Sequence, residues 1–184
     1  SQFLQNYDRA VGLHEESLRL FRAANDPAGV AVALVTLGTM AQLRGDYVQA
    51  FNLCEESVAQ FRQLGDRHGV ASALVNLGNV AWATNQPGIA ESCYQEAVAL
   101  FRELGDHREL AAALRNLATA ARHDGDSPRA IEQARESLEL YNELGDSDGI
   151  LACLAILANA FAASAQDDNA VRLLGAIERM HRQT

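Results

Sequence analysis

The sequence predicts an all-α fold, a right-handed α-α superhelix in which about nine antiparallel helices stack as a solenoid of repeats. Shifted against itself by 40 residues, the chain aligns without a gap from Tyr7 to its end. Self-similarity of this period is typical of stacked repeat architectures. Apolar residues recur three and four positions apart, as in "GVASALVNLGNVAW", and no stretch alternates with the period of a strand. We therefore expect helices throughout.

Columns of equivalent residues recur at this interval and mark the candidate core and corners of each repeat. One column is aromatic, one is Asp, two are Leu and one is Ala, and a further column holds small residues that allow a neighbouring helix to approach closely. In that order the columns are Phe21, Phe61, Phe101 and Tyr141; Asp26, Asp66, Asp106 and Asp146; Leu34, Leu74, Leu114 and Leu154; Leu37, Leu77, Leu117 and Leu157; Ala10, Ala50, Ala90, Ala130 and Ala170; Gly38, Gly78, Ala118 and Ala158.

Two kinds of corner separate the helices. At each "LGD" corner the Gly, or Asn25 in "AAND", can adopt the left-handed conformation that ends a helix, and the following Asp is a good N-cap. At the corners "GDY", "NQP" and "GDSP", Pro87 and Pro128 fit a first helical turn. Ala165 replaces Gly at the last of these corners. The expected organisation is a single solenoid domain over 1–184, with an orphan second helix at 6–24 and repeats at 25–64, 65–104, 105–144 and 145–184.

Composition excludes several classes of function. The net charge of −9 argues against a direct nucleic-acid binder and against an anionic membrane surface. No apolar run approaches the ~20 residues that cross a membrane. The cysteines Cys54, Cys93 and Cys153 have no CxxC spacing, which favours buried reduced thiols in a cytoplasmic protein. All basic residues are Arg, which hints at a bacterial source, and the patterned start suggests a piece of a larger protein.

No motif for catalysis or cofactor binding is present. The sequence contains no P-loop, GxGxxG, HExxH or GxSxG. The five histidines are dispersed, and none pairs with another His or Cys at helical spacing. Acid pairs such as Glu15–Glu16 and Glu55–Glu56 fit a solvated outer face. We expect no catalytic residue, no metal and no cofactor, and thus no enzyme.

The repeat resembles the tetratricopeptide repeat, through Leu74, Leu77, Gly78, Ala81, Ala90 and Ala97 in the second full copy. That family's usual repeat has 34 residues, whereas this one has 40. The longer form looks like the repeats of large bacterial signal-transduction ATPases, including MalT-like, LuxR-type and AfsR-type transcription regulators. The tail Asn169–Met180 looks like the end of such arrays.

The resemblance implies that the first helix of each pair lines a concave groove. Its Asn side chains suit an extended peptide backbone, its Arg side chains suit a carboxylate or phosphate, and Trp82 could stack on a ligand. The alternative is that these are ordinary solvated positions and that Trp82 fills a helix end. The carboxylate clamp of chaperone-binding members is not matched, because Val35 and Thr39 stand at its first polar positions. The candidate ligand-binding residues are Asn76, Asn79, Trp82, Arg115, Asn116 and Arg122.

These features favour a protein-interaction or ligand-sensing module of a larger bacterial signalling or transcription regulator. The alternative is a free-standing peptide-binding adapter. The expected partner is a protein, a peptide or a small effector in the groove, without direct nucleic-acid or membrane binding. Apolar residues at the ends, such as Val171, Leu173, Leu174 and Ile177, also predict a homodimer.

Overall fold

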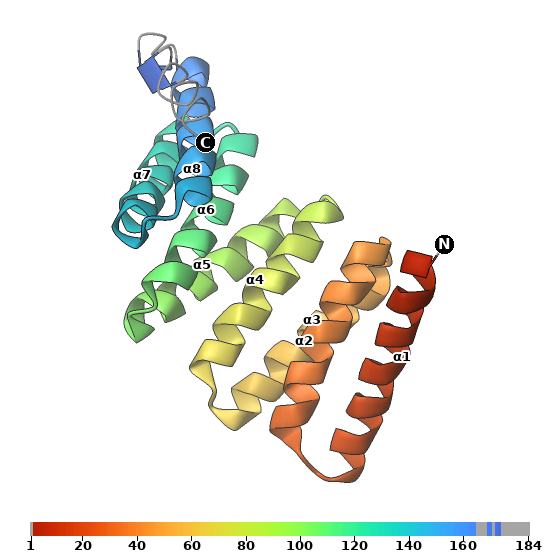
Figure 1. The fold of residues 1–184 in the computed structure, drawn as a ribbon. Coiled ribbons are helices and arrows are strands. Elements are labelled where there is room, and N and C mark those ends of the chain that lie inside the picture. Colours follow the sequence, from red (N-terminus) through yellow and green to blue (C-terminus); the bar gives the residue numbers. More distant parts are fainter. Residues whose placement is uncertain (1, 165–168, 171, 174–184) are drawn as a thin grey trace. The chain divides into compact units, whose positions relative to one another are not determined.

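All regular structure in the computed structural model is α-helical among the residues that it describes, which are 2–164, 169, 170, 172 and 173 (Figure 1). The predicted all-α repeat fold is therefore confirmed. The orphan helix begins at Gln2 rather than near residue 6. Of the predicted ninth helix, residues 169, 170, 172 and 173 are described and are helical, and the rest of the tail lies outside the described residues. The helices are α1 (Gln2–Ala23), α2 (Pro27–Arg44), α3 (Tyr47–Leu64), α4 (Arg67–Ala83), α5 (Pro87–Leu104), α6 (His107–His123), α7 (Ser127–Leu144) and α8 (Ser147–Ala163).

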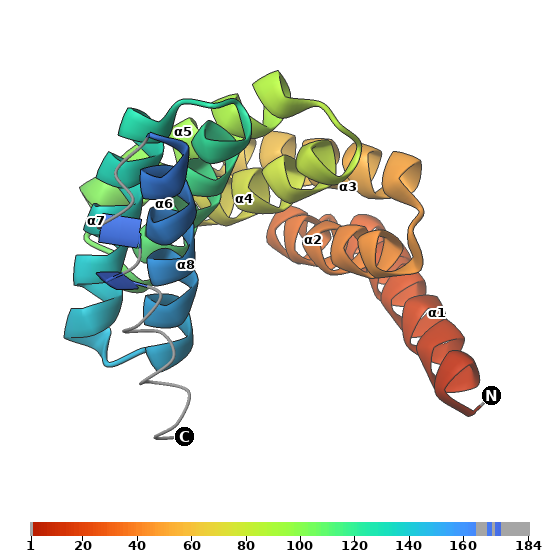
Figure 2. The same ribbon diagram turned by 90° about the horizontal axis from the view of Figure 1, so that it is seen from above.

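The chain divides into two compact units, Ser1–Leu100 and Phe101–Thr184, and the division falls within α5. In the first unit α2 packs against α1 and α3, α3 packs against α4, and α2 also contacts α4 (Figures 1 and 2). In the second unit α7 packs against α6 and α8, and α6 contacts α8. In each unit the first helices of neighbouring repeats are therefore adjacent to one another.

The corners form as the sequence predicts. Asn25 and Asn85 have φ values of 53° and 57°, and Gly65 has φ 69°, so each ends its helix in the left-handed region. The Asp after each of these "LGD" or "AND" corners caps the next helix; Asp66 Oδ1, for example, accepts a hydrogen bond from the Gly69 amide at 2.9 Å. The corner at Ala165 lies outside the described residues.

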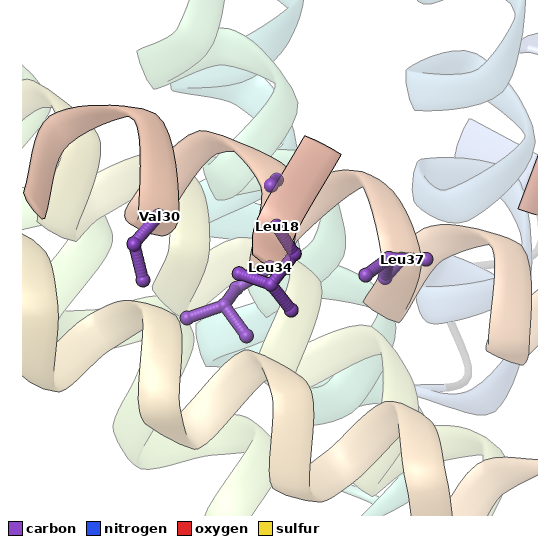
Figure 3. Packing of buried hydrophobic residues seen from close by; sticks show 5 residues of the cluster. Leu18, Val30, Leu34 and Leu37 are labelled. Carbon is purple, nitrogen blue, oxygen red and sulfur yellow. The ribbon is translucent and has the colours of Figure 1, made fainter. Parts of the chain in front are cut away.

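The core follows the predicted apolar columns. In the first unit Leu18 of α1 packs against Val30, Leu34 and Leu37 of α2 (Figure 3). In the second unit Leu157 and Phe161 pack with Ala118, Ala134 and Ala170, and partly buried Leu173 packs against this cluster. Val171, Leu174 and Ile177, the other apolar residues that the sequence analysis names at this end, lie outside the described residues.

Small residues bring the two helices of a repeat together. A Cβ on Gly38 would lie 2.9 Å from Cys54 Sγ, and a Cβ on Gly78 would lie 2.6 Å from the ring of Tyr94. Contacts this short do not occur for real Cβ atoms, so glycine is needed at both positions. The larger side chain on α5 thus fits only because α4 offers bare backbone at Gly78.

Candidate functional site

The six candidate residues lie on first helices, three in each unit. Asn76, Asn79 and Trp82 are half-buried on α4 in the first unit. Spacings of three residues place them along one side of the helix. We call this side, with the equivalent positions Thr36 and Thr39 on the adjacent α2, the α4 face.

The second unit carries the remaining three candidates on α6. Arg115 and Asn116 are half-buried, and Arg122 is exposed. Arg115 and Arg122 are seven residues apart, two helical turns, so they lie on the same side of the helix. We call the side that carries these three residues the α6 face. Its arginines are a local concentration of positive charge in a protein with a net charge of −9.

The environment of each arginine is different. Burial raises the pKa of Tyr141, and the Arg115 guanidinium opposes that shift, which places its charge near the α7 tyrosine. Arg122 lies in the last turn of α6, where a cation is favoured by the helix dipole. A test of ligand binding at these arginines therefore needs a measurement of stability beside it.

Asn79 is held by a residue that the sequence did not single out. The buried Tyr94 of α5 donates its hydroxyl hydrogen to Asn79 Oδ1 at 2.8 Å. The signal for this contact is a column in which Tyr94 is exceptional, since its equivalents are His14, Cys54 and Ala134. Only the pairing of helices across a corner brings a residue fifteen positions away to Asn79.

The three cysteines do not form a reactive site. All are free and buried, as predicted for Cys54 and Cys153. Burial raises the pKa of both Cys54 and Cys93 to about 11, which keeps the thiols protonated near neutral pH. Within the described residues, no group of three His, Cys, Asp or Glu side chains could hold a metal ion.

Two shallow surface depressions lie at helix corners. One, about 370 Å³, lies at the corner between α1 and α2 and includes Phe21, Asn25 and Gln60. Another, about 260 Å³, lies beside Tyr47, Phe51 and Thr84. None of the six candidate residues lines either depression. The α4 and α6 faces are candidates through their side-chain chemistry.

Paired helices stacked at a fixed period define this chain as a helical-repeat protein. A family model described as "Tetratricopeptide repeat" matches residues 29–103 and 70–143, which together span more than half of the chain. The chain belongs to the tetratricopeptide repeat family. A search of curated proteins found no match.

Several solved structures share the fold at low sequence identity. BtubC (BKLC) from P. vanneervenii is 20% identical with a TM-score of 0.89, over 99% of this chain and 76% of that one. A signal transduction ATPase from Pyrococcus horikoshii with a tetratricopeptide repeat sensor is 14% identical with a TM-score of 0.81, over 94% of this chain and 28% of that one. A Rap protein complexed with Competence and Sporulation Factor is 13% identical with a TM-score of 0.70, over 96% and 59%. These likenesses establish the fold. In the part of the chain that the structure describes, no helix is long and apolar enough to cross a membrane.

Proposed function

We propose that this chain is the protein-interaction and ligand-sensing module of a larger cytoplasmic regulator of bacterial signalling or transcription. Its family membership supports an interaction role rather than catalysis. The similar repeat array of the Pyrococcus horikoshii ATPase is described as a sensor, which supports the same role here. The 40-residue repeat resembles those of MalT-like, LuxR-type and AfsR-type regulators. This resemblance supports the proposal that the chain is part of a larger regulator.

The proposed ligand is an extended peptide with at least one acidic group. The observation that carries this proposal is the side-chain chemistry of the first helices, with Asn76 and Asn79 on the α4 face and Arg115 and Arg122 on the α6 face. Amide side chains match the alternating donors and acceptors of a peptide backbone. Guanidinium groups match carboxylates. Trp82 adds an apolar surface on which a side chain of the ligand can pack.

Replacing both arginines of the α6 face tests the proposal. An array of random acidic, basic and uncharged peptides is screened with the wild-type chain, and the bound peptides are measured again with Arg115→Ala/Arg122→Ala. We expect acidic peptides to be lost while the melting temperature stays nearly unchanged, since surface exchanges usually alter stability by less than about 0.5 kcal/mol.

The control is Arg62→Ala/Arg102→Ala, which removes the same amount of charge from ion pairs between second helices. Peptide binding should survive in this control. Equal loss of binding in both variants would show that net charge, and not the α6 face, attracts the peptides. A large fall in melting temperature for the first variant would show that its arginines are structural.

Two alternatives to this proposal are considered. The ligand of the same surface is a small effector, or the chain is a free-standing adapter. If no peptide binds but a metabolite library yields a ligand whose affinity depends on Arg115 and Arg122, the module senses a small effector. The intact gene product decides the other alternative. An ATPase segment or a helix-turn-helix segment in it favours the regulator, and a gene product that contains only the repeats favours the adapter.

A further inference from the structure

Two columns of the repeat change from apolar to polar residues where they meet in the second unit. Tyr141 of α7 stands in a column that is otherwise phenylalanine, and Arg115 of α6 stands in a column that is otherwise valine or alanine. The equivalents of the two residues are Phe21, Phe61 and Phe101, and Val35, Val75 and Ala155. The other repeats fold with these apolar residues, so the repeat itself does not require the phenol hydroxyl or the guanidinium.

The Tyr141 ring contacts both first helices of this unit. It is 4% exposed and packs with Ala111 of α6 and Cys153 of α8. A Cβ on Gly149 of α8 would lie 2.3 Å from the ring, so the ring fits only against bare backbone. Arg115 follows Ala111 by one helical turn on the same side of α6. The ring is therefore fixed beside the turn of α6 that carries Arg115.

The Arg115 guanidinium lies close to the Tyr141 hydroxyl. Burial raises the pKa of Tyr141 and the pKa of Cys153, and in both groups the positive charge of Arg115 acts against the rise. A charge that acts on Cys153 of α8 lies on the side of α6 that faces α8. Since α6 and α8 contact each other, both polar groups belong to the line of contact between these helices, which we call the α6–α8 seam.

Both polar groups are available to a ligand. Among the described side chains, none forms a hydrogen bond with the Tyr141 hydroxyl or an ion pair with Arg115. In the same part of the chain, the fully enclosed side-chain oxygen that lacks a hydrogen-bond partner is Gln133 Oε1. The Tyr141 hydroxyl is not enclosed in this way, so it reaches solvent although its ring is buried.

The carboxylates near this hydroxyl are held by other groups. Beyond burial, Asp146 and Glu109 also raise the pKa of the tyrosine. Asp146 Oδ1 accepts a hydrogen bond from the Gly149 amide at 2.9 Å, and Asp146 Oδ2 lies 3.9 Å from Arg108. Glu109 lies in the first turn of α6, where the helix dipole favours its charge. Both thus leave the neighbouring guanidinium to a carboxylate from outside.

We propose that Arg115 and Tyr141 form one carboxylate-binding subsite, in which the guanidinium and the phenol hydroxyl donate hydrogen bonds to the same carboxylate of the ligand. The proposal rests on the proposed peptide-binding function of the α6 face. It narrows that function, because it assigns one acidic group of the peptide to the α6–α8 seam and adds a hydroxyl donor from a second helix.

The chemistry of the two groups suits a carboxylate. A guanidinium has only N–H donors and matches the two oxygens of a carboxylate. Burial raises the pKa of Tyr141, so its hydroxyl stays protonated near neutral pH and remains a donor. A hydrogen bond to a charged acceptor is stronger than one between neutral groups. The pair therefore distinguishes an acidic side chain from its amide, which has a single oxygen and no charge.

Tyr141→Phe removes the hydroxyl and restores the residue that the column has elsewhere, so the fold should stay intact. With the tightest acidic peptide from the array, we expect this variant to bind about 10-fold more weakly, the usual effect of losing a hydrogen bond to a charged group. The control is Phe61→Tyr, which adds a hydroxyl in the first unit, where the other column has Val35. It should bind like the wild type. Equal binding by Tyr141→Phe and the wild type would overturn the subsite and leave the peptide-binding function standing.

Coupling between the two residues separates a shared subsite from two independent effects. Arg115→Val also restores a residue of its column. In this background Tyr141→Phe should weaken binding by about 2-fold at most, whereas in an Arg122→Ala background it should still weaken binding about 10-fold. Melting temperatures are measured for every variant. An undiminished effect of Tyr141→Phe in the Arg115→Val background would show that the hydroxyl acts apart from Arg115, which overturns the proposal.

A small probe tests the subsite apart from the proposed function. N-acetylglutamate α-amide and its uncharged analogue N-acetylglutamine α-amide are titrated against the wild type and Tyr141→Phe, and the Arg115 Nε–H resonance is followed. We expect the charged probe alone to shift this resonance, and to do so at lower concentration in the wild type. A wild type that binds no peptide but responds to the charged probe refutes the peptide-binding function and supports the subsite. No response, or an equal response in both proteins, refutes the subsite.

Discussion

At the scale of single residues, large side chains on one helix lie against small residues on its neighbour. The cysteine side chains help to fill the spaces between helices in this way. Cys54 lies against Gly38, and Cys93 is adjacent in sequence to Tyr94, which lies against Gly78. Cys153 donates to the buried Ser137 hydroxyl at 3.2 Å. Such cysteines behave as small apolar residues, because burial disfavours their charged form.

The buried thiols make the free energy of unfolding depend on pH in the alkaline range. Burial raises the pKa of Cys54 and Cys93 from 9.0 to about 11. Above pH 9 the unfolded chain therefore loses these protons before the folded chain does, which favours unfolding. We expect the free energy of unfolding to be unaffected by them below about pH 9 and to fall between about pH 9 and pH 11.

Urea unfolding at a series of pH values measures this effect. Cys54→Ala/Cys93→Ala lacks both thiols, so its stability should decline less steeply over the same range, even though its stability at neutral pH is lower. Tyr94 contributes at the upper end, because burial raises its pKa as well. Identical slopes for the two proteins would contradict the assignment of these thiols.

At the residue scale, the sequence predicts which positions are buried better than it predicts which side chains bond to one another. The Leu and Ala columns are buried as expected, since their period matches one face of a helix. The hydrogen bond between Tyr94 and Asn79 could not be predicted from the sequence. Neither the residue types nor their spacing shows that the Tyr94 ring lies against Gly78 and brings its hydroxyl to the next residue of α4. For the same reason the half-burial of Arg115 is a finding of the structure.

At the scale of helices, the described corners combine a left-handed residue with an Asp cap, except the corner before α5, where Asn85 is followed by Gln86. The carbonyls at the end of one helix accept hydrogen bonds from the corner amides; the Gly65 amide donates to the Arg62 carbonyl at 3.1 Å, and the Asp66 amide to the Phe61 carbonyl at 3.0 Å. Gly and Asn are the residues that adopt this conformation readily. This is local chemistry, so the sequence was sufficient to predict it.

Exchanges at the corners should therefore act through the backbone alone. A Cβ on Gly65 would meet nothing within 4 Å, yet its φ is +69°. We expect Gly65→Ala to lower the free energy of unfolding by about 1–2 kcal/mol. Asn85→Gly should be nearly neutral, because Asn85 already has φ 57° and glycine adopts it without strain.

Gly12 is the matched control, because it lies within α1 with open space around it. Gly12→Ala should raise the free energy of unfolding by about 0.5–1 kcal/mol. Chemical denaturation of the three variants compares the effects directly. If Gly65→Ala and Gly12→Ala change stability in the same direction, backbone conformation is not what determines the corner.

Ion pairs between successive second helices were not predicted. Arg22 pairs with Glu56, Arg62 with Glu96 and Arg102 with Glu136, each at 2.7 Å. The two members of a pair are 34 residues apart, so they belong to different repeats and no helical spacing connects them. Both side chains of each pair remain substantially exposed, so each pair contributes at most about 1 kcal/mol.

At the scale of the whole molecule, the repeat period is the strongest prediction. The helices α2, α4, α6 and α8 begin at Pro27, Arg67, His107 and Ser147, which is the 40-residue interval of the sequence. A gapless repeat restricts the chain to a stack, because each copy buries its apolar side only against neighbours. The candidate residues are divided between the two units, three in each.

The last prediction concerns association between copies of the chain. Leu13 and Leu20 on α1 are 57% and 62% exposed. Their equivalents in later repeats are more buried: Cys93, in the column of Leu13, is 7% exposed, and Leu100 and Leu140, in the column of Leu20, are half-buried. Exposed apolar side chains on one helix favour a partner surface. We expect the chain to form a two-fold dimer through α1, the simplest closed assembly.

Light scattering over a concentration series measures the association. The wild type should shift from monomer toward dimer as concentration rises, and added salt should favour the dimer because it screens the repulsion between two chains of net charge −9. Leu13→Gln/Leu20→Gln should remain monomeric. Leu43→Gln/Val48→Gln is the matched control, since both residues are 77% exposed at the corner between α2 and α3. A monomeric wild type at every concentration would refute the dimer, and loss of the dimer only in the control would move the interface to that corner.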